Sequence, residues 1–116
     1  MPNRKIMRVS RSAHKYVDYR YCQDPLVSID QLRGLGYKII CLEITDSSVD
    51  ILSFALPANS KVCLVIGSEV DGIDDSILAI SDDIIHITMH GNNSSMNVGM
   101  AAAIALHRLT DLISSQ

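Results

Sequence analysis

The sequence predicts an α/β domain with a mostly parallel sheet flanked by helices. Three apolar segments rich in Val, Ile and Leu, residues 37–44, 61–66 and 84–89, alternate with segments of helical pattern. Nearly continuous apolar runs are typical of strands buried on both faces, and their alternation with helices is typical of parallel sheets. A chain of 116 residues has the length of one domain with its own core.

The N-terminal segment is basic. The first 20 residues contain six of the ten Lys and Arg residues and one of the thirteen Asp and Glu residues. The segment is polar with weak periodicity, so we expect residues 1–24 to form an irregular basic arm and residues 25–116 to form the domain. Such an arm either contacts a polyanion such as RNA or is a solvated segment without a partner.

Two short helices are expected between the strands. Residues 28–35 follow a helical pattern, with Ser28 able to cap the free backbone N–H groups and with Gly34 and Gly36 at the end. Residues 74–81 form the second helix, with two acidic residues at its positive N-terminal end. Residues 46–59 show no clear pattern.

The longest helix is expected over residues 95–113, capped by Ser94 or Ser95. Residues 96–106 are apolar on nearly every face, and a helix of this kind is buried on more than one side. One side is expected to pack on the sheet and another on a second subunit of a homodimer. A helix sandwiched within one chain would show the same pattern.

Polar residues follow each predicted strand. Segments 43–46, 67–72 and 90–97 are rich in Gly, Ser, Asn and acidic residues. Because parallel strands bind ligands at their carboxyl ends, the sequence predicts a site at this edge of the sheet. Segment 67–72 matches neither G-x-x-x-x-G-K-[ST] nor G-x-G-x-x-G, and a tight turn is its alternative interpretation.

Other kinds of site are not predicted. His86 and His90 are four residues apart, but a strand and its loop do not place them on one face, so no metal pair is expected. Cys22, Cys41 and Cys63 form no C-x-x-C pair, which favours a reducing, cytoplasmic setting. No membrane span is expected, since no run of 18 apolar residues occurs, and no apolar stretch of a secretory signal follows the basic N-terminus.

Two motifs resemble those of a known family. Residues 64–73, LVIGSEVDGI, resemble the second motif of the SpoU (TrmH-like) RNA ribose 2′-O-methyltransferases of the SPOUT class. Residues 87–91, ITMHG, and 95–101, SMNVGMA, resemble the third motif, I-P-M-x-G and S-L-N-V-S-x-A, at the family's interval. Residues 8–14 and 43–48 resemble the corresponding segments of the family's branch that methylates a guanosine ribose in tRNA.

The resemblance implies a SPOUT-type fold with a C-terminal trefoil knot, in a homodimer that binds S-adenosylmethionine and RNA, tRNA rather than rRNA, without a metal. Asn97 and Glu69 are the implied candidates for catalytic residues. The implied cofactor contacts are Leu42, Gly67, Ile87, Ser95, Met96 and Asn97.

The basic arm would supply the phosphate contacts that this family of RNA enzymes needs. Such contacts position a strand without activating its 2′-hydroxyl. The implied RNA-binding residues are Arg4, Arg8, Arg11 and Lys15.

The chain departs from the family's pattern in three places. The first motif, N-x-G-x-x-x-R-[ST]-A, which contains an arginine needed for the reaction, is absent, so the chain looks truncated at the N-terminus relative to the family. Thr88 stands for the usual Pro and Gly99 for the usual Ser. Thr88 restores a backbone N–H, and we expect it to loosen its loop.

Two functions are therefore open. The second and third motifs favour an S-adenosylmethionine-dependent RNA ribose 2′-O-methyltransferase acting on tRNA or rRNA. The absent first motif favours the alternative, a catalytically inactive SPOUT remnant that serves as a dimeric S-adenosylmethionine- or RNA-binding module.

Overall fold

The structure is a computed structural model, and it describes residues 4–11, 15–22, 25–57, 60–67, 72–88 and 98–114. For residues 4–11, 15–22, 98–100 and 114 the description is restricted to the backbone. In chain order the elements are β1 (Arg4–Arg11), β2 (Lys15–Cys22), α1 (Pro25–Gly34), β3 (Lys38–Leu42), β4 (Val49–Asp50), the 3-10 turn η1 (Ile51–Ser53), β5 (Lys61–Ile66), α2 (Asp75–Ile80), β6 (Asp83–His86) and α3 (Val98–Ser114).

The strands form one sheet in the order β2-β1-β5-β3-β6-β4. β5, β3, β6 and β4 are parallel to one another, while β1 is antiparallel to both β5 and β2. The predicted α/β class with a mostly parallel sheet is confirmed. In the register of the central strands, Leu42 pairs with Ile66 on one side and with Ile85 on the other.

The prediction of an irregular arm over residues 1–24 is wrong. β1 and β2 form an antiparallel hairpin, and β1 joins the sheet by pairing with β5, from Lys5 opposite Ile66 to Ser10 opposite Lys61. This pairing joins segments more than 50 residues apart, so weak local periodicity could not show it. The four basic residues expected to contact RNA therefore belong to the sheet's antiparallel part.

α1 begins three residues earlier than predicted. Its first residue is Pro25, whose fixed φ and missing N–H suit the first helical position, so the cap expected at Ser28 is wrong. The predicted stop is confirmed, because Gly36 has φ +93° and its N–H donates to the carbonyl oxygen of Arg33 at 3.0 Å. The N–H of Tyr37 donates to the carbonyl oxygen of Leu32, also at 3.0 Å, which completes a Schellman motif.

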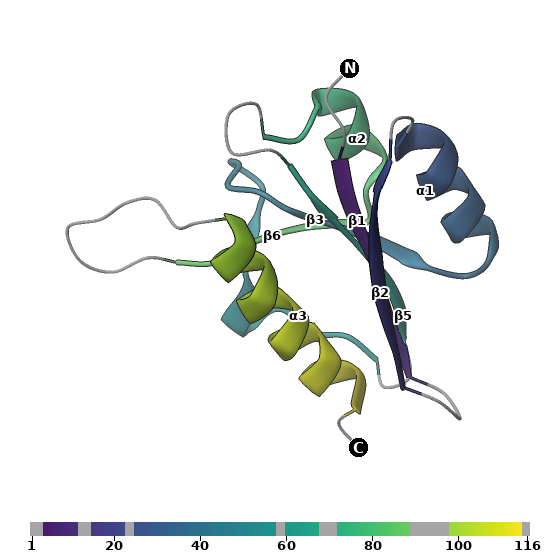
Figure 1. Cartoon of the computed structure of the whole chain (residues 1–116). Helices are drawn as coiled ribbons and strands as arrows, with labels where there is room; N and C mark the ends of the chain where they lie inside the picture. Colours follow the sequence, from purple (N-terminus) through teal and green to yellow (C-terminus); the bar gives the residue numbers. More distant parts are fainter. Residues whose placement is uncertain are drawn as a thin grey trace.

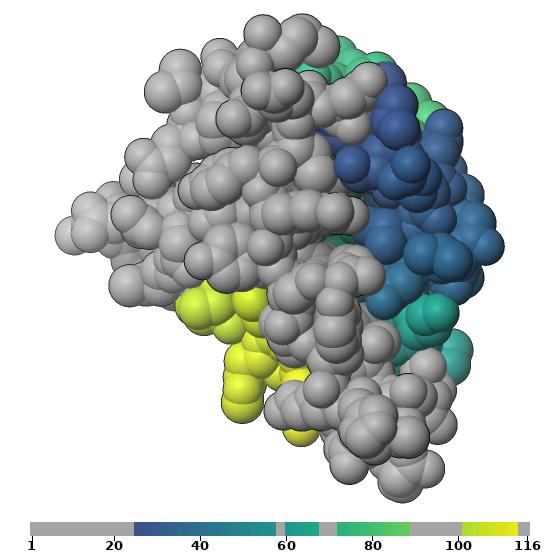
Figure 2. Space-filling model, turned by 45° about the vertical axis from the view of Figure 1, so that its right-hand side comes forward, coloured from purple at the N-terminus to yellow at the C-terminus, as the bar shows by residue number. Residues whose placement is uncertain are grey.

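Helices cover both faces of the sheet (Figure 1). α1 and α2 lie on one face, where Ile29, Leu32 and Ile77 pack with alternate residues of β3 and β5. The described parts of α1 (dark blue) and α3 (yellow) emerge at opposite sides of the view in Figure 2. Because both faces are covered, β3 and β5 are apolar at nearly every position.

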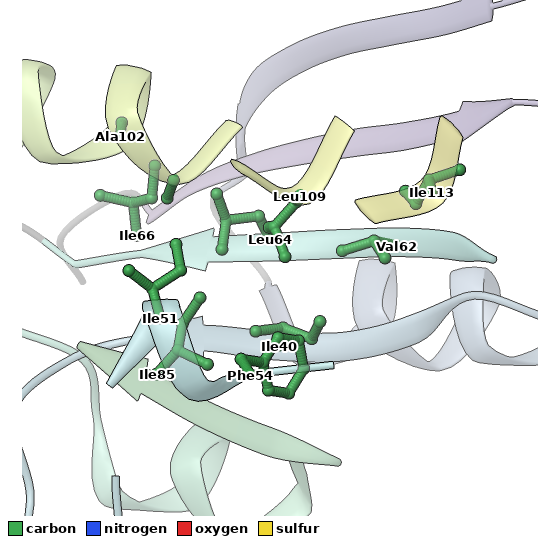
Figure 3. Close-up of a cluster of buried hydrophobic side chains, with 11 residues drawn as sticks. Ile40, Ile51, Phe54, Val62, Leu64, Ile66, Ile85, Ala102, Leu109 and Ile113 are labelled. Carbon is green, nitrogen blue, oxygen red and sulfur yellow. The ribbon is translucent and has the colours of Figure 1, made fainter. Parts of the chain in front are cut away.

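α3 packs on the other face. In Figure 3, Ile66, Leu64 and Val62 of β5 lie beneath Ala102, Leu109 and Ile113 of α3, and all belong to one buried cluster. The opposite side of α3 is exposed at Ala103, Ile104, His107 and Asp111. The expectation that one side of this helix packs on the sheet is therefore confirmed.

The remaining boundaries differ from prediction by a few residues. β5 has the predicted bounds, and β3 and β6 lie within or next to the predicted strands. The segment without a clear pattern contains the two-residue strand β4 and η1, both too short to produce a periodicity. The implied knot depends on residues 89–97 and so lies outside the described residues.

Candidate functional site

The carboxyl ends of three neighbouring parallel strands meet at one edge of the sheet, as predicted. Leu42 ends β3, Gly67 follows β5, and Ile87 follows β6. Leu42 and Ile87 are half-buried, and both pack against the apolar cluster beneath α3. These three candidate cofactor contacts therefore lie at the ends of adjacent strands, on an edge that continues into the core.

Gly67 is in close contact with the end of its own loop. A Cβ atom on Gly67 would lie 2.7 Å from the backbone nitrogen of Ile73 and closer still to the carbonyl group of Gly72. The space next to Gly67 on this side is thus filled by backbone rather than left for a ligand. A larger side chain would prevent the segment 67–72 from closing, which is a different reason for glycine from direct contact with a cofactor.

Glu43 connects the end of β3 to strand β6 on one side and to Ile73, beyond β5, on the other. Its backbone N–H donates to the carbonyl oxygen of Ile85 at 2.9 Å, which extends the pairing with β6. Its carboxylate oxygen Oε2 accepts a hydrogen bond from the backbone N–H of Ile73 at 3.0 Å. Glu43 therefore holds the end of the 67–72 segment against β3.

Thr88 is attached to β4. Its hydroxyl donates a hydrogen bond to the carboxylate of Asp50. The same carboxylate accepts from the backbone N–H of Leu52 at 2.8 Å and so caps η1. The loop that Thr88 was expected to loosen lies outside the described residues, while at residue 88 itself the side chain supplies a bond that a proline would lack.

His86 has a defined hydrogen-bond partner at the same edge. Its Nδ1 lies 2.8 Å from the hydroxyl of Ser48, which itself donates to the carbonyl oxygen of Thr45 at 2.9 Å. His90, with which no metal pair was expected, lies outside the described residues. Among the described side chains, no group of three His, Cys, Asp or Glu residues is arranged to hold a metal ion.

Two cysteine side chains lie under the site on the α1 face. Cys41 and Cys63 are buried, and neither forms a disulfide. Burial raises the pKa of the Cys41 thiol from 9.0 to about 11, a nearby Glu43 charge adds to the increase, and a hydrogen bond with Ser81 opposes it. A thiol with such a pKa is protonated at neutral pH and is not a nucleophile.

The remaining predicted site residues are placed in part or not at all. Glu69, Ser95, Met96 and Asn97 lie outside the described residues. The basic residues Arg4, Arg8, Arg11 and Lys15 are placed by their backbone alone, with Arg8 opposite Asp18 and Arg11 opposite Lys15 in the hairpin.

Sequence reasoning missed the roles of Glu43, Asp50 and Ser48. Glu43 follows β3, Ser48 immediately precedes β4 and Asp50 lies in β4, and polar residues at a sheet edge are a general sign of a site. The available signal was therefore their position, while their partners are about 30 to 38 residues away and could not be identified.

Comparison with known proteins identifies what the chain is similar to. The model of the SpoU rRNA Methylase family matches residues 1–107. Among curated proteins, the chain is similar to tRNA (guanosine(18)-2′-O)-methyltransferases. It is 24% identical over 101 residues to that of Borreliella burgdorferi, which covers 87% of this chain and 45% of the relative. It is 32% identical over 80 residues to that of Escherichia coli K12, which covers 69% of this chain and 34% of the relative.

A solved structure has the same fold. The TrmH/SpoU tRNA modifying enzyme of Aquifex aeolicus superposes with a TM-score of 0.65 at 26% sequence identity, covering 78% of this chain and 45% of that one. The chain thus spans less than half the length of these relatives. None of the described helices is long and apolar enough to cross a bilayer.

Proposed function

The chain belongs to the SpoU rRNA methylase family, and from this we propose that it acts in methyl transfer from S-adenosylmethionine to a ribose 2′-hydroxyl of tRNA or rRNA. The observation that carries the proposal is the meeting of Leu42, Gly67 and Ile87 at one edge of a sheet of the family's fold. Similarity to tRNA methyltransferases supports tRNA as the substrate class.

The described residues at this edge fit the proposed cofactor. Leu42 and Ile87 offer half-buried apolar surface, and Gly67 is half-buried beside them. Such a wall suits a neutral adenine ring, which needs apolar contact and a few hydrogen bonds rather than charge. Bound S-adenosylmethionine would supply an activated methyl group, while Ser95, Met96 and Asn97 would complete its contacts.

The chain's own residues have the tasks of binding, orientation and proton removal. The transferred methyl group, the 2′-oxygen and the leaving sulfur must be aligned. We assign RNA phosphate contacts to Arg4, Arg8, Arg11 and Lys15, because cationic residues on a sheet hairpin can position a strand. Glu69 and Asn97 remain the proposed residues next to the reacting groups.

The finer properties of the family are part of the proposal. We propose a homodimer formed by the exposed side of α3, around Ala103, Ile104 and His107, and a knot formed by the segment between β6 and α3. Ile104 is 40% exposed, which leaves an apolar side chain available for this contact. A cytoplasmic location accords with the buried thiols of Cys41 and Cys63, which form no disulfide.

Calorimetry with S-adenosylhomocysteine tests the cofactor site. A Leu42→Asp variant should lose binding at least tenfold, because a carboxylate would enter a half-buried apolar wall. Leu35→Asp is the matched control, since Leu35 is 61% exposed and precedes β3 at its opposite end. Equal binding by both variants would contradict the assignment of this edge.

Methyl transfer to RNA tests the reaction. The protein should transfer labelled methyl groups from S-adenosylmethionine to bulk tRNA or rRNA. Because a methylated 2′-oxygen cannot attack the neighbouring phosphate, the RNA should resist alkaline cleavage at the labelled nucleotide. Cofactor binding without transfer would contradict the proposed activity and favour a non-catalytic binding module.

A further inference from the structure

Glu43 is bonded on two sides at the proposed cofactor edge. Its backbone N–H donates to Ile85 of β6 at 2.9 Å, while its Oε2 accepts from the N–H of Ile73 at 3.0 Å. Its other oxygen, Oε1, accepts from the N–H of Ile44 at 3.3 Å. One residue at the end of β3 therefore contacts the strand on one side and the end of the β5–α2 connection on the other.

The Glu43 carboxylate lies directly against Gly72, so a side chain at residue 72 would displace it. Gly72 has φ +68°, and a Cβ atom there would lie 2.6 Å from Oε2 of Glu43. A Cβ atom on Gly67 would in turn overlap the carbonyl group of Gly72. Contact is thus continuous from Gly67 at the end of β5, through Gly72, to Glu43 at the end of β3.

The contact places Gly72 and Ile73 relative to β3. A carboxylate accepts a backbone N–H bond more strongly than a neutral oxygen does. The strand pairing of Leu42 with Ile66 fixes the ends of β3 and β5, and burial fixes the side chain of Ile73 in the core beneath α1 and α2. The Glu43 carboxylate adds the bond that holds the backbone N–H of Ile73 at this edge.

We propose that Glu43 is a positioning residue for cofactor binding, which acts by holding Gly72 and Ile73 against Gly67 and the end of β3. The inference rests on the proposed function, since it takes this edge as the S-adenosylmethionine site. Glu43 touches no reacting atom in this assignment. Its effect should therefore appear in cofactor affinity and in KM for the cofactor rather than in kcat.

The first test needs no cofactor. Amide hydrogen exchange at Ile73 is measured by NMR in the unmodified protein, Glu43→Ala, Glu43→Gln and Asp46→Ala. Glu43→Ala should accelerate exchange at Ile73 about tenfold or more, and Glu43→Gln should accelerate it less, because its amide oxygen still accepts. Asp46→Ala is the matched control, as it removes an exposed carboxylate three residues away.

The second test measures S-adenosylhomocysteine affinity by calorimetry in the same four proteins, at a temperature where all are folded by circular dichroism. Glu43→Ala should bind about tenfold more weakly, Glu43→Gln should recover most of the loss, and Asp46→Ala should bind as the unmodified protein does. Where transfer is measurable, KM for S-adenosylmethionine should increase with kcat little changed.

The possible results distinguish failure of the positioning role of Glu43 from failure of the proposed function. Absence of binding by the unmodified protein would overturn the proposed function. Normal affinity in Glu43→Ala, whether or not Ile73 exchanges faster, would overturn the positioning role while leaving the function intact. A loss of kcat with unchanged KM would also overturn it, because that pattern indicates a role in the chemical step.

Discussion

The hydroxyl oxygen of Ser48 lies 2.8 Å from Nδ1 of His86. Ser48 already donates its proton to the carbonyl oxygen of Thr45 at 2.9 Å and accepts from the N–H of Thr45 at 3.0 Å. Its remaining lone pair can only accept, so Nδ1 of His86 must carry the hydrogen in this contact. Neutral His86 therefore has an unprotonated Nε2, which is the form that can accept a proton.

This assignment predicts the tautomer of His86. In long-range ¹H–¹⁵N NMR spectra at a pH where the ring is neutral, Nδ1 of His86 should appear protonated and Nε2 should not. Ser48→Ala should remove this preference, because the acceptor is lost. The exposed His107 of α3 serves as the internal comparison, and a neutral His86 with its proton on Nε2 would contradict the assignment.

Substitution of two glycines should have opposite effects on stability. Gly67→Ala should lower the free energy of unfolding by about 1–3 kcal/mol, because its Cβ would overlap the Gly72 backbone. Gly34→Ala should be neutral or stabilising by up to about 1 kcal/mol, since nothing lies within 4 Å of its Cβ position and it ends a helix. Urea unfolding of both variants measures the difference, and equal effects would show that residue 67 has room.

Two neighbouring alanines of α3 should differ when replaced by glutamate. Ala102 is 4% exposed and packs in the core beneath α3, so Ala102→Glu should destabilise the protomer by several kcal/mol. Ala103 is exposed on the other side, so Ala103→Glu should leave the protomer's melting temperature within a few degrees. Thermal unfolding monitored by circular dichroism tests this pair.

The Ala103→Glu variant also tests the proposed homodimer. If the exposed side of α3 forms the subunit contact, repulsion between the two introduced carboxylates should make the Ala103→Glu variant more monomeric than the unmodified protein. Sedimentation velocity measures the shift. An unmodified protein that sediments as a monomer, or an Ala103→Glu variant that stays dimeric, would count against this surface.

The raised pKa of the Cys41 thiol predicts that the protein loses stability at high pH. Its pKa is raised to about 11 in the folded protein, against 9.0 for the ordinary thiol. Between these values the unfolded chain loses a proton that the folded chain retains, so the free energy of unfolding decreases as pH increases, by at most about 3 kcal/mol. Chemical unfolding at pH 8 to 11 should show that the free energy of unfolding falls less steeply with pH in Cys41→Ala than in the unmodified protein. An equally steep fall in both proteins would contradict the raised pKa of Cys41.

The sequence predicted the parallel part of the sheet well, because buried strands and amphipathic or apolar helices leave local patterns. β5 has the predicted bounds, and the strand ends that carry Leu42, Gly67 and Ile87 lie at one edge as expected. The alternation of Val17, Tyr19 and Tyr21 with Asp18 and Arg20 was a local signal of a strand that the sequence analysis missed. The place of the hairpin beside β5 depends on a long-range pairing, which no local pattern encodes.

The sequence predicted which edge of the sheet carries the candidate site, but not which residues bond one another there. Glu43 and Ile73 are 30 residues apart, and Asp50 and Thr88 are 38 apart, so their bonds follow from the packing of strands and loops rather than from neighbouring residues. The roles of Glu69, Ser95, Met96 and Asn97 stay predictions of the family resemblance.

The pairing of β1 with β5 has a consequence for the order of events during synthesis. β1 is synthesised before its partner β5, which begins at Lys61, about 50 residues after β1 ends. At translation rates of about 5–20 residues per second, the hairpin waits roughly 3–10 s for the strand that it joins. During that interval β2 is the one partner of β1 already made among the described strands, and the other edge of β1 is open to association with other nascent chains.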